Sequence, residues 1–163
     1  MIIFLNGSIN AGKSTIAKLL EKELPNTALV EIDVFHEMIE WLPIDKAVPI
    51  NLENAISVIR NFAKRGINVI VPYPLSQKNH NYVIDELKDL DTEIHFFTLS
   101  PKLEKTLTNR GSRELSDQER DRIKHHYKIG IPSPAFGEII DNTDQTPEET
   151  VGYILKKINE LQS

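Results

Sequence analysis

Short apolar runs alternate along the chain with longer segments in which apolar residues recur every three or four positions. A short run that is apolar throughout is typical of a parallel strand buried on both faces, whereas the wider spacing is typical of an amphipathic helix. Strands that alternate with helices predict an α/β fold of three layers, with a five-stranded parallel sheet between two layers of helices. The pattern places strands at 2–5, 28–33, 67–71, 93–100 and 137–142, and helices at 13–24, 34–41, 51–66, 81–90, 116–127 and 146–161.

Polar residues and glycines mark several of the predicted helix ends. Ser116 and Thr146 each stand before a helix and are followed three residues later by a glutamate, which is the pattern of a capping box. Gly66 ends the helix at 51–66, because glycine readily takes the left-handed conformation that closes a helix. No linker or low-complexity tract interrupts the alternation, so the sequence predicts a single domain over residues 1–163.

Composition and charge narrow the class of protein. The chain has 163 residues, enough for one domain with a core and too few for two. Its formal net charge is -5 and it has no long basic run, which disfavours nucleic acid as the main partner. It has no cysteine, which excludes disulfides and thiolate metal sites. Since no signal segment and no apolar run of about 20 residues is present, we expect no membrane partner and predict a cytoplasmic protein.

Residues 7–14, the phosphate loop, match the pattern G-x-x-x-x-G-K-[ST] at every position, with a predicted strand before them and a helix after them. In such a loop backbone N–H groups point at phosphate oxygens, the lysine reaches the β- and γ-phosphates, and the final serine ligates Mg²⁺. The alternative is a glycine-rich turn that only enters a helix. The pattern favours ATP and Mg²⁺ as cofactors, with the metal on Ser14 and the nucleotide on Gly7, Ser8, Ile9, Asn10, Ala11, Gly12, Lys13, Ser14 and Thr15.

Asp33 is the last residue of the second predicted strand, on the edge of the sheet where ligands of open α/β folds bind. A carboxylate there can accept the proton of an acceptor hydroxyl or hold a magnesium-bound water. In the alternative interpretation Asp33 caps the helix at 34–41. The two roles are compatible, and we assign Asp33 to catalysis, together with Lys13, and to the acceptor site.

Two arginines flank a glycine-serine pair after the fourth predicted strand, at Arg110 and Arg113. This arrangement suits a lid that closes over the transferring phosphoryl group and stabilises its charge. We therefore predict a lid at roughly 110–128 and assign both arginines to catalysis.

Further basic residues follow within the helix at 116–127. For Arg120 and Arg122, ion pairing on a solvated helix surface explains the pattern at least as well as a role in the lid. His125 and His126 are interpreted as exposed helix positions and not as a metal site.

Polar and aromatic residues stand after three other predicted elements. Asn142 and Thr143 follow the fifth strand, where the chain passes the base of a bound nucleotide, and we assign them to the nucleotide site. Tyr73 and Gln77 follow the third strand, and Trp41 ends the helix at 34–41. We assign these three residues to the acceptor site, with a half-buried place in the core as the alternative for Trp41 and Tyr73.

The phosphate loop, Asp33, the arginine-bearing lid and the "IIDNT" ending resemble the small P-loop kinases of the nucleoside-monophosphate-kinase and shikimate-kinase type. Within that class the chain is most similar to the chloramphenicol phosphotransferase group, which has an acid proposed as base after strand two and an Arg-Gly-containing lid. It departs from shikimate kinases, which carry Asp-x-Asp where this chain reads Asp33-Val34-Phe35 and a Gly-Gly pair where it reads "PYP". It also lacks the acid with which many P-loop enzymes end strand three.

These features together predict an ATP-dependent phosphotransferase that moves the γ-phosphoryl group to a hydroxyl of a small molecule, either a metabolite or an antibiotic. The alternative is a nucleotide-binding NTPase or regulatory module without a small-molecule acceptor. GTPase switches need an Asn-Lys-x-Asp stretch and an Asp-x-x-Gly after strand three, and neither is in its place. The acidic balance of charge disfavours a polynucleotide kinase.

Overall fold

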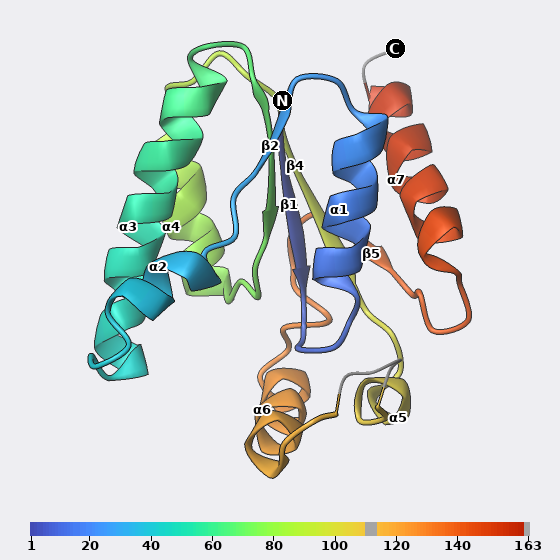
Figure 1. The fold of residues 1–163 in the computed structure, drawn as a ribbon. Helices are drawn as coiled ribbons and strands as arrows, with labels where there is room; N and C mark the ends of the chain where they lie inside the picture. The colour runs from blue at the N-terminus through green and yellow to red at the C-terminus, as the bar shows by residue number, and fades with distance from the viewer. Residues whose placement is uncertain (110–113, 162–163) are drawn as a thin grey trace.

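The computed structural model describes residues 1–109 and 114–161 and has one parallel sheet at its centre (Figure 1). The five strands follow the order β2-β3-β1-β4-β5 and every neighbouring pair is parallel, which confirms the predicted α/β fold. The strands are β1 (Ile2–Gly7), β2 (Thr27–Leu29), β3 (Asn68–Pro72), β4 (Ile94–Leu99) and β5 (Glu138–Ile140). The helices are α1 (Lys13–Glu23), α2 (Asp33–Met38), α3 (Ile44–Ala63), α4 (Gln77–Leu87), α5 (Leu103–Thr106), α6 (Asp117–Lys128) and α7 (Pro147–Leu161).

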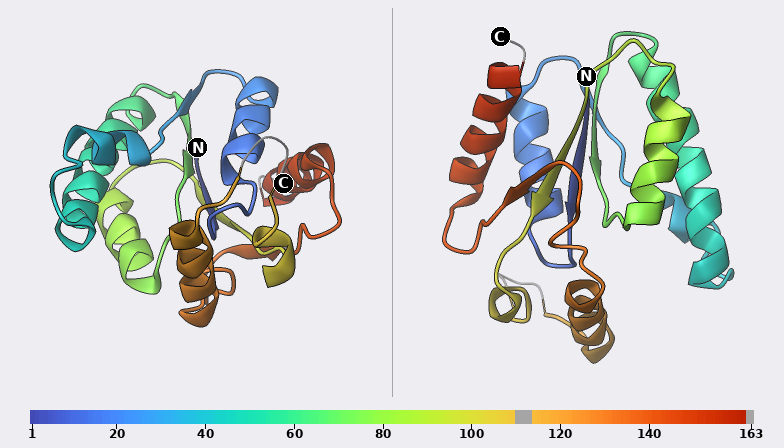
Figure 2. Two further views of the ribbon diagram at one scale, coloured as in Figure 1. Left: turned by 60° about the horizontal axis from the view of Figure 1, so that its bottom comes forward. Right: turned by 180° about the vertical axis from the view of Figure 1, so that it is seen from behind.

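Helices cover both faces of the sheet, with α3 and α4 on one side and α1 and α7 on the other (Figure 2). Successive side chains of a strand point to opposite faces, so β1 supplies both cores. Ile2 and Phe4 pack under α3 and α4, whereas Ile3 and Leu5 pack under α1 and α7. This double burial is the reason why β1 is apolar at consecutive positions. None of the described helices is long and apolar enough to span a bilayer.

The second strand is shorter than the sequence predicts. It ends at Leu29, and Asp33 is the first residue of α2 and not the last residue of a strand. The Val30 N–H still donates to the Ile70 carbonyl oxygen (2.9 Å), but Ile32 already has helical backbone angles (φ -65°, ψ -28°), so α2 starts directly after it. Val30 and Ile32 are buried in the core beside α3. The predicted capping role of Asp33 is also wrong, since the N-cap of α2 is Ile32 and it has no side-chain capping bond.

Two helices begin earlier than predicted and one short helix was not predicted. Helix α3 begins at Ile44 and not at 51. The prediction began later because Pro49, which lies inside the helix, is of a residue type that usually breaks helices. Helix α4 begins at Gln77, with the Ser76 side chain accepting a hydrogen bond from the Asn79 N–H (3.2 Å). Helix α5 has only four residues, too few to give a periodic pattern.

The two predicted capping boxes are confirmed. Before α6 the Ser116 hydroxyl accepts from the Glu119 N–H and the glutamate carboxylate accepts from the Ser116 N–H (3.1 and 3.0 Å). Before α7 the same exchange joins Thr146 and Glu149 (3.2 and 2.8 Å). The boxes fix the starts of α6, which lies over the phosphate loop, and of α7, which packs beside α1.

The carboxyl ends of the strands meet at one edge, beyond which lie α5 and α6, whereas α2 lies beside this edge against α3 (Figure 1). Asn6, fully buried in β1, connects the elements at this edge. Its Nδ2 donates to Thr98 Oγ1 (3.1 Å) and to the Ile131 carbonyl oxygen (3.2 Å), and its Oδ1 accepts from the Leu75 N–H (2.8 Å). One side chain thus joins β1 to β4, to the connection after β3 and to the segment that follows α6.

Asn6→Ala should lower the free energy of unfolding by about 3 kcal/mol, because it leaves the buried Leu75 N–H and Thr98 hydroxyl without their partner. Urea denaturation of the purified variant measures this loss. The matched control is Asn61→Ala on the exposed surface of α3, expected to change stability by less than about 0.5 kcal/mol. Equal effects of the two substitutions would show that Asn6 does not connect the edge.

Candidate active site

The phosphate loop connects β1 to α1 in a backbone conformation that few residues allow. Gly7 has φ 140°, and a Cβ at this position would lie 2.6 Å from the Leu99 carbonyl oxygen. Gly12 has φ 104° directly before α1. Both values favour glycine, which accounts for the two glycines of the motif. The Lys13 ammonium lies inside the loop, where Nζ donates to the carbonyl oxygens of Gly7 (3.0 Å) and Ser8 (2.7 Å).

Two asparagine side chains connect the loop to neighbouring segments. Asn10 Nδ2 donates to the carbonyl oxygens of Thr106 and Thr108, each at 2.9 Å, so the end of α5 is attached to the loop. Asn142, after β5, donates from Nδ2 to the Ala11 carbonyl oxygen at 3.0 Å. Both side-chain amides therefore bind protein carbonyls, and the loop is supported from two sides before any nucleotide binds.

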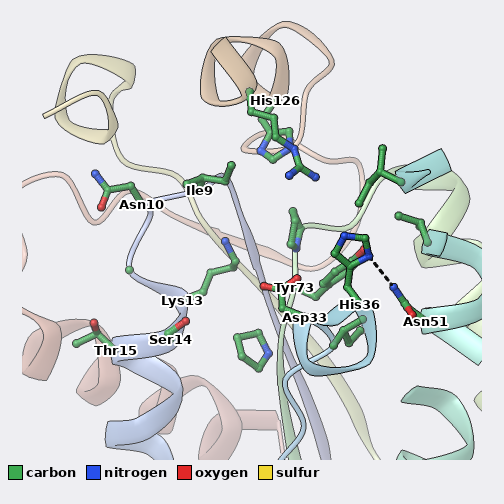
Figure 3. Close-up of a pocket in the computed structure, with 17 residues that line it drawn as sticks. Ile9, Asn10, Lys13, Ser14, Thr15, Asp33, His36, Asn51, Tyr73 and His126 are labelled. Carbon is green, nitrogen blue, oxygen red and sulfur yellow. Dashed lines mark hydrogen bonds between the residues drawn. The ribbon is translucent and has the colours of Figure 1, made fainter. Parts of the chain in front are cut away.

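A cavity of about 390 Å³ opens over the loop (Figure 3). Lys13 and Ser14 line it from the loop and α1, and Asp33 lines it from the start of α2. The lysine and the carboxylate thus line one cavity, although they belong to different helices. The full lining consists of Ile9, Asn10, Gly12, Lys13, Ser14, Thr15, Ile32, Asp33, His36, Ile44, Val48, Asn51, Pro72, Tyr73, Pro74, Arg122 and His126.

The wall around Asp33 combines polar groups with apolar surface. Burial raises the pKa of Tyr73, and the nearby Asp33 carboxylate raises it further while Arg122 opposes the shift. The Tyr73 hydroxyl therefore stays protonated and able to donate a hydrogen bond. Asn51, only 2% exposed, has Nδ2 at 3.5 Å from His36 Nδ1. The apolar part of this wall consists of Ile32, Ile44, Val48, Pro72 and Pro74.

A second cavity of about 400 Å³ lies on the other side of the loop. Asn142 and Thr143 line it, together with Gly12 and Thr15. The Thr143 hydroxyl accepts from the Lys102 N–H (2.9 Å) and donates to Asp141 Oδ1 (2.5 Å), which fixes the turn after β5. The two cavities share Gly12 and Thr15, so one elongated ligand that follows the loop can reach both.

Some residues assigned from the sequence lie elsewhere. Trp41 is 80% exposed, Gln77 is exposed on the first turn of α4 and bonds Asn81 (2.8 Å), and neither assigned residue lines either cavity. Arg110 and Arg113 lie outside the described residues. Within the loop, Gly7, Ser8 and Ala11 do not line the cavities; Ser8 and Ala11 are fully buried.

The structure adds four polar residues to the lining of the cavity over the loop that the sequence analysis did not assign: His36, Asn51, Arg122 and His126. For His126 the expected exposure is wrong, since the residue is only 8% exposed, whereas His125 is exposed as predicted. One feature of the sequence indicates that this face of α6 is buried. The only apolar residue in its middle, Ile123, is buried, and His126 lies three positions later on the same side of the helix.

The His126 ring is neutral because of its surroundings. Burial lowers the pKa of His126 to about 4, and the positive charges of Lys13 and Arg122, together with His125, lower it in the same direction. Its Nδ1 lies 3.2 Å from the hydroxyl of the buried Ser8. A neutral imidazole can either accept from this hydroxyl or donate to it.

The residues present fit a magnesium ion that arrives with a nucleotide. Ser14 and Asp33 line the same cavity, and hydroxyl and carboxylate oxygens are the ligands that Mg²⁺ prefers. In the part of the chain that the structure describes, no group of three His, Cys, Asp or Glu residues could hold a metal ion. Such a donor set suits a metal whose remaining ligands are phosphate oxygens and waters.

Fold and site together define the class of P-loop kinases: a phosphate loop between the central strand and a helix, with a carboxylate lining the same cavity. A family model for chloramphenicol phosphotransferase-like proteins matches residues 1–159. The chain belongs to this family, which confirms the resemblance, and it is a phosphotransferase that uses a nucleotide donor and a small-molecule acceptor. No curated protein matches the chain.

Solved structures with the same fold share little sequence with the chain. The tunicamycin resistance protein of Deinococcus radiodurans has a TM-score of 0.69 at 21% identity, covering 96% of this chain and 94% of its own. A sugar kinase from Janibacter sp. HTCC2649 has a TM-score of 0.74 at 17% identity, with 97% and 94% covered. The shikimate kinase of Aquifex aeolicus has a TM-score of 0.62 at 19% identity, with 99% and 98% covered. At these identities the likeness concerns the fold.

The free energy of unfolding should fall by about 1.5 kcal/mol between pH 6.5 and pH 5 because of His126. The unfolded histidine, with its ordinary pKa near 6.5, binds a proton in this range, whereas the folded residue, with a pKa of about 4, stays neutral. Acid therefore favours the unfolded chain. Urea denaturation at both pH values, in wild type and His126→Leu, isolates this contribution, which the variant should lack.

The control for this measurement is the exposed neighbour, in the variant His125→Asn, which should keep the wild-type dependence on pH. The carboxylate of Asp89, whose pKa the Arg60 guanidinium lowers to about 2, titrates below this range and does not interfere. The same dependence in wild type and His126→Leu would contradict a neutral buried ring.

Proposed function

We propose that the protein transfers the γ-phosphoryl group of ATP to a hydroxyl group of a small molecule. The observation that supports this proposal is the single cavity lined by Lys13 and Ser14 and also by Asp33. A phosphate-binding lysine and a candidate proton acceptor then border one space, in which we expect the small acceptor to bind. The whole chain would act as one kinase domain with α6 as part of its lid.

On the donor side, the triphosphate would lie along the phosphate loop. The loop N–H groups and the N-terminus of α1 bind its oxygens, and Lys13 exchanges the carbonyls of Gly7 and Ser8 for the β- and γ-phosphates. The base would occupy the second cavity, beside Asn142 and Thr143. Magnesium held by Ser14 supplies neutralisation of phosphate charge.

On the acceptor side, Asp33 would act as general base. The acceptor hydroxyl gives its proton to the Asp33 carboxylate while its oxygen bonds to the γ-phosphorus, and the bond from that phosphorus to the bridging oxygen of ADP breaks. Tyr73, His36 and Asn51 offer hydrogen bonds to the rest of the acceptor. The apolar residues of the same wall favour an acceptor that carries apolar surface as well as its hydroxyl.

Two roles and the cellular location remain predictions from the sequence. Arg110 and Arg113 stay predicted to stabilise the transferring group, and a cytoplasmic location stays a prediction. Trp41 and Gln77 have no place in this proposal, because neither lines the cavity. An NTPase or regulatory module without acceptor would not need the mixed polar and apolar wall around Asp33, which favours the kinase.

Lys13→Ala should abolish phosphoryl transfer, because it removes the cation that neutralises the β- and γ-phosphates. The measurement is ADP release from ATP and Mg²⁺, with and without a panel of metabolite and antibiotic acceptors. Lys18→Ala, on the exposed face of the same helix, is the control and should retain wild-type rates. Full activity of Lys13→Ala would refute the assignment of the loop, and ADP release that no acceptor stimulates would favour the NTPase.

Asp33→Asn should lower kcat by about 10²–10⁴-fold and leave the affinity for ATP nearly unchanged, since an amide cannot take the proton of the acceptor. Steady-state kinetics with a stimulating acceptor, together with ATP titration, separates the two quantities. Glu37→Gln, an exposed change on α2 outside the cavity, should be neutral. A kcat within a few-fold of wild type would exclude Asp33 as the base.

A further inference from the structure

Helix α6 stands apart from the sheet, beyond its carboxyl edge (Figure 1). Only two of its side chains, Ile123 and His126, are buried. Arg120 donates to the Leu107 carbonyl oxygen and to Asn109 Oδ1, which attaches the first half of the helix to the segment after α5. The second half depends on other contacts, and His126 provides the one that reaches the phosphate loop.

His126 and Ser8 form a buried hydrogen bond between the helix and the loop. The distance from Nδ1 to Oγ is 3.2 Å, and the two residues are 8% and 0% exposed. The carbonyl oxygen of the same serine accepts from Lys13 Nζ at 2.7 Å. Ser8 therefore contacts the helix through its side chain and Lys13 through its backbone carbonyl. A displacement of α6 would consequently also displace the residue that binds Lys13.

Burial and nearby positive charge both oppose protonation of His126. Lys13 from the loop and Arg122 from α6 bring that charge, and His125 acts in the same direction. The ring is therefore neutral, and its Nδ1 can either accept from the Ser8 hydroxyl or donate to it. Protonation does not break the contact at neutral pH.

Arg122 lies four residues before His126 and hence on the same side of the helix. It lines the cavity over the phosphate loop, close enough to Tyr73 to oppose the upward shift of the pKa of that residue. No hydrogen bond or ion pair joins Arg122 to another residue within 1–109 and 114–161. A guanidinium without a partner among these residues, at a cavity that Lys13 also lines, is suited to an anionic ligand.

We propose that the Ser8–His126 hydrogen bond latches α6 onto the phosphate loop and thereby positions Arg122 to contact the phosphoryl group in transfer. His126 is the positioning residue and Arg122 the catalytic one. The role of Arg122 rests on the proposed kinase function, whereas the latch does not. The arginine so assigned is within the helix and differs from Arg110 and Arg113, the two that the sequence favours.

The latch is tested first without reference to activity, by hydrogen exchange of the α6 amides. His126→Leu and Ser8→Ala should each raise exchange in α6 by about 10-fold or more, because both remove the same bond. The double variant should exchange no faster than His126→Leu. His126→Asn, whose amide lies near the place of Nδ1, should restore protection, and His125→Asn is the control. Unchanged α6 exchange in both single variants would overturn the latch.

The consequence for Arg122 is tested by acceptor-dependent turnover. Arg122→Ala should lower kcat by about 10²-fold with the KM for ATP within about 3-fold of wild type, as for loss of one transition-state contact. His126→Leu should lower kcat by about 10-fold or more. The double variant should be no slower than Arg122→Ala, because His126 acts through the arginine. Multiplied losses, or an unchanged kcat in Arg122→Ala, would overturn the assignment.

The two experiments distinguish a failure of the proposed kinase function from a failure of the latch. If the wild-type protein releases no ADP with any acceptor of the panel, the proposed function and the role of Arg122 fall, and hydrogen exchange still decides the latch. If wild type is active and the α6 amides exchange equally in wild type and His126→Leu, the kinase stands and the latch falls.

Discussion

Hydrogen bonds to three separate parts of the chain hold the phosphate loop between β1 and α1. Asn10 of the loop binds two carbonyls at the end of α5, Asn142 binds the Ala11 carbonyl from the segment after β5, and His126 binds Ser8 from α6. The loop has no regular secondary structure of its own, so these side-chain bonds to neighbouring segments maintain its conformation, and the bond from Asn142 also pairs one of its backbone carbonyls. The shape of both cavities depends on them, because residues of the loop line each cavity.

The carboxyl edge of the sheet brings donor and acceptor groups together. Parallel strands end on the same side, so the loop after β1 and the segments after β2 and β3 meet there, and with them Lys13, Asp33 and Tyr73. Asn6 fixes the spacing of this edge through bonds to three neighbouring segments. The chemistry proposed for the site thus needs few specialised residues and depends largely on where the strands end.

Positive charge at this edge explains why a neutral histidine connects α6 to the phosphate loop. A protonated histidine beside Lys13 and Arg122 would repel both, whereas a neutral ring provides a polar contact without adding charge. The low pKa of His126 thus belongs to the same arrangement that places Arg122 at the cavity, where we propose that its guanidinium contacts the phosphoryl group.

The sequence by itself determined the five-stranded parallel sheet, the phosphate loop, both capping boxes and the family. All of these follow from local patterns: apolar runs, glycines with positive φ, and side chains that bond backbone groups a few residues away. It misplaced the end of β2 and the start of α3, because the backbone already turns helical at Ile32 and α3 includes Pro49, which local preference would exclude from a helix. Only the tertiary structure decided that Trp41 and Gln77 lie outside the cavity while His36, Asn51, Arg122 and His126 lie within it. Those positions depend on how helices pack over the sheet edge, and contacts between residues more than a hundred positions apart, such as Ser8 and His126, leave no periodic signal in the chain.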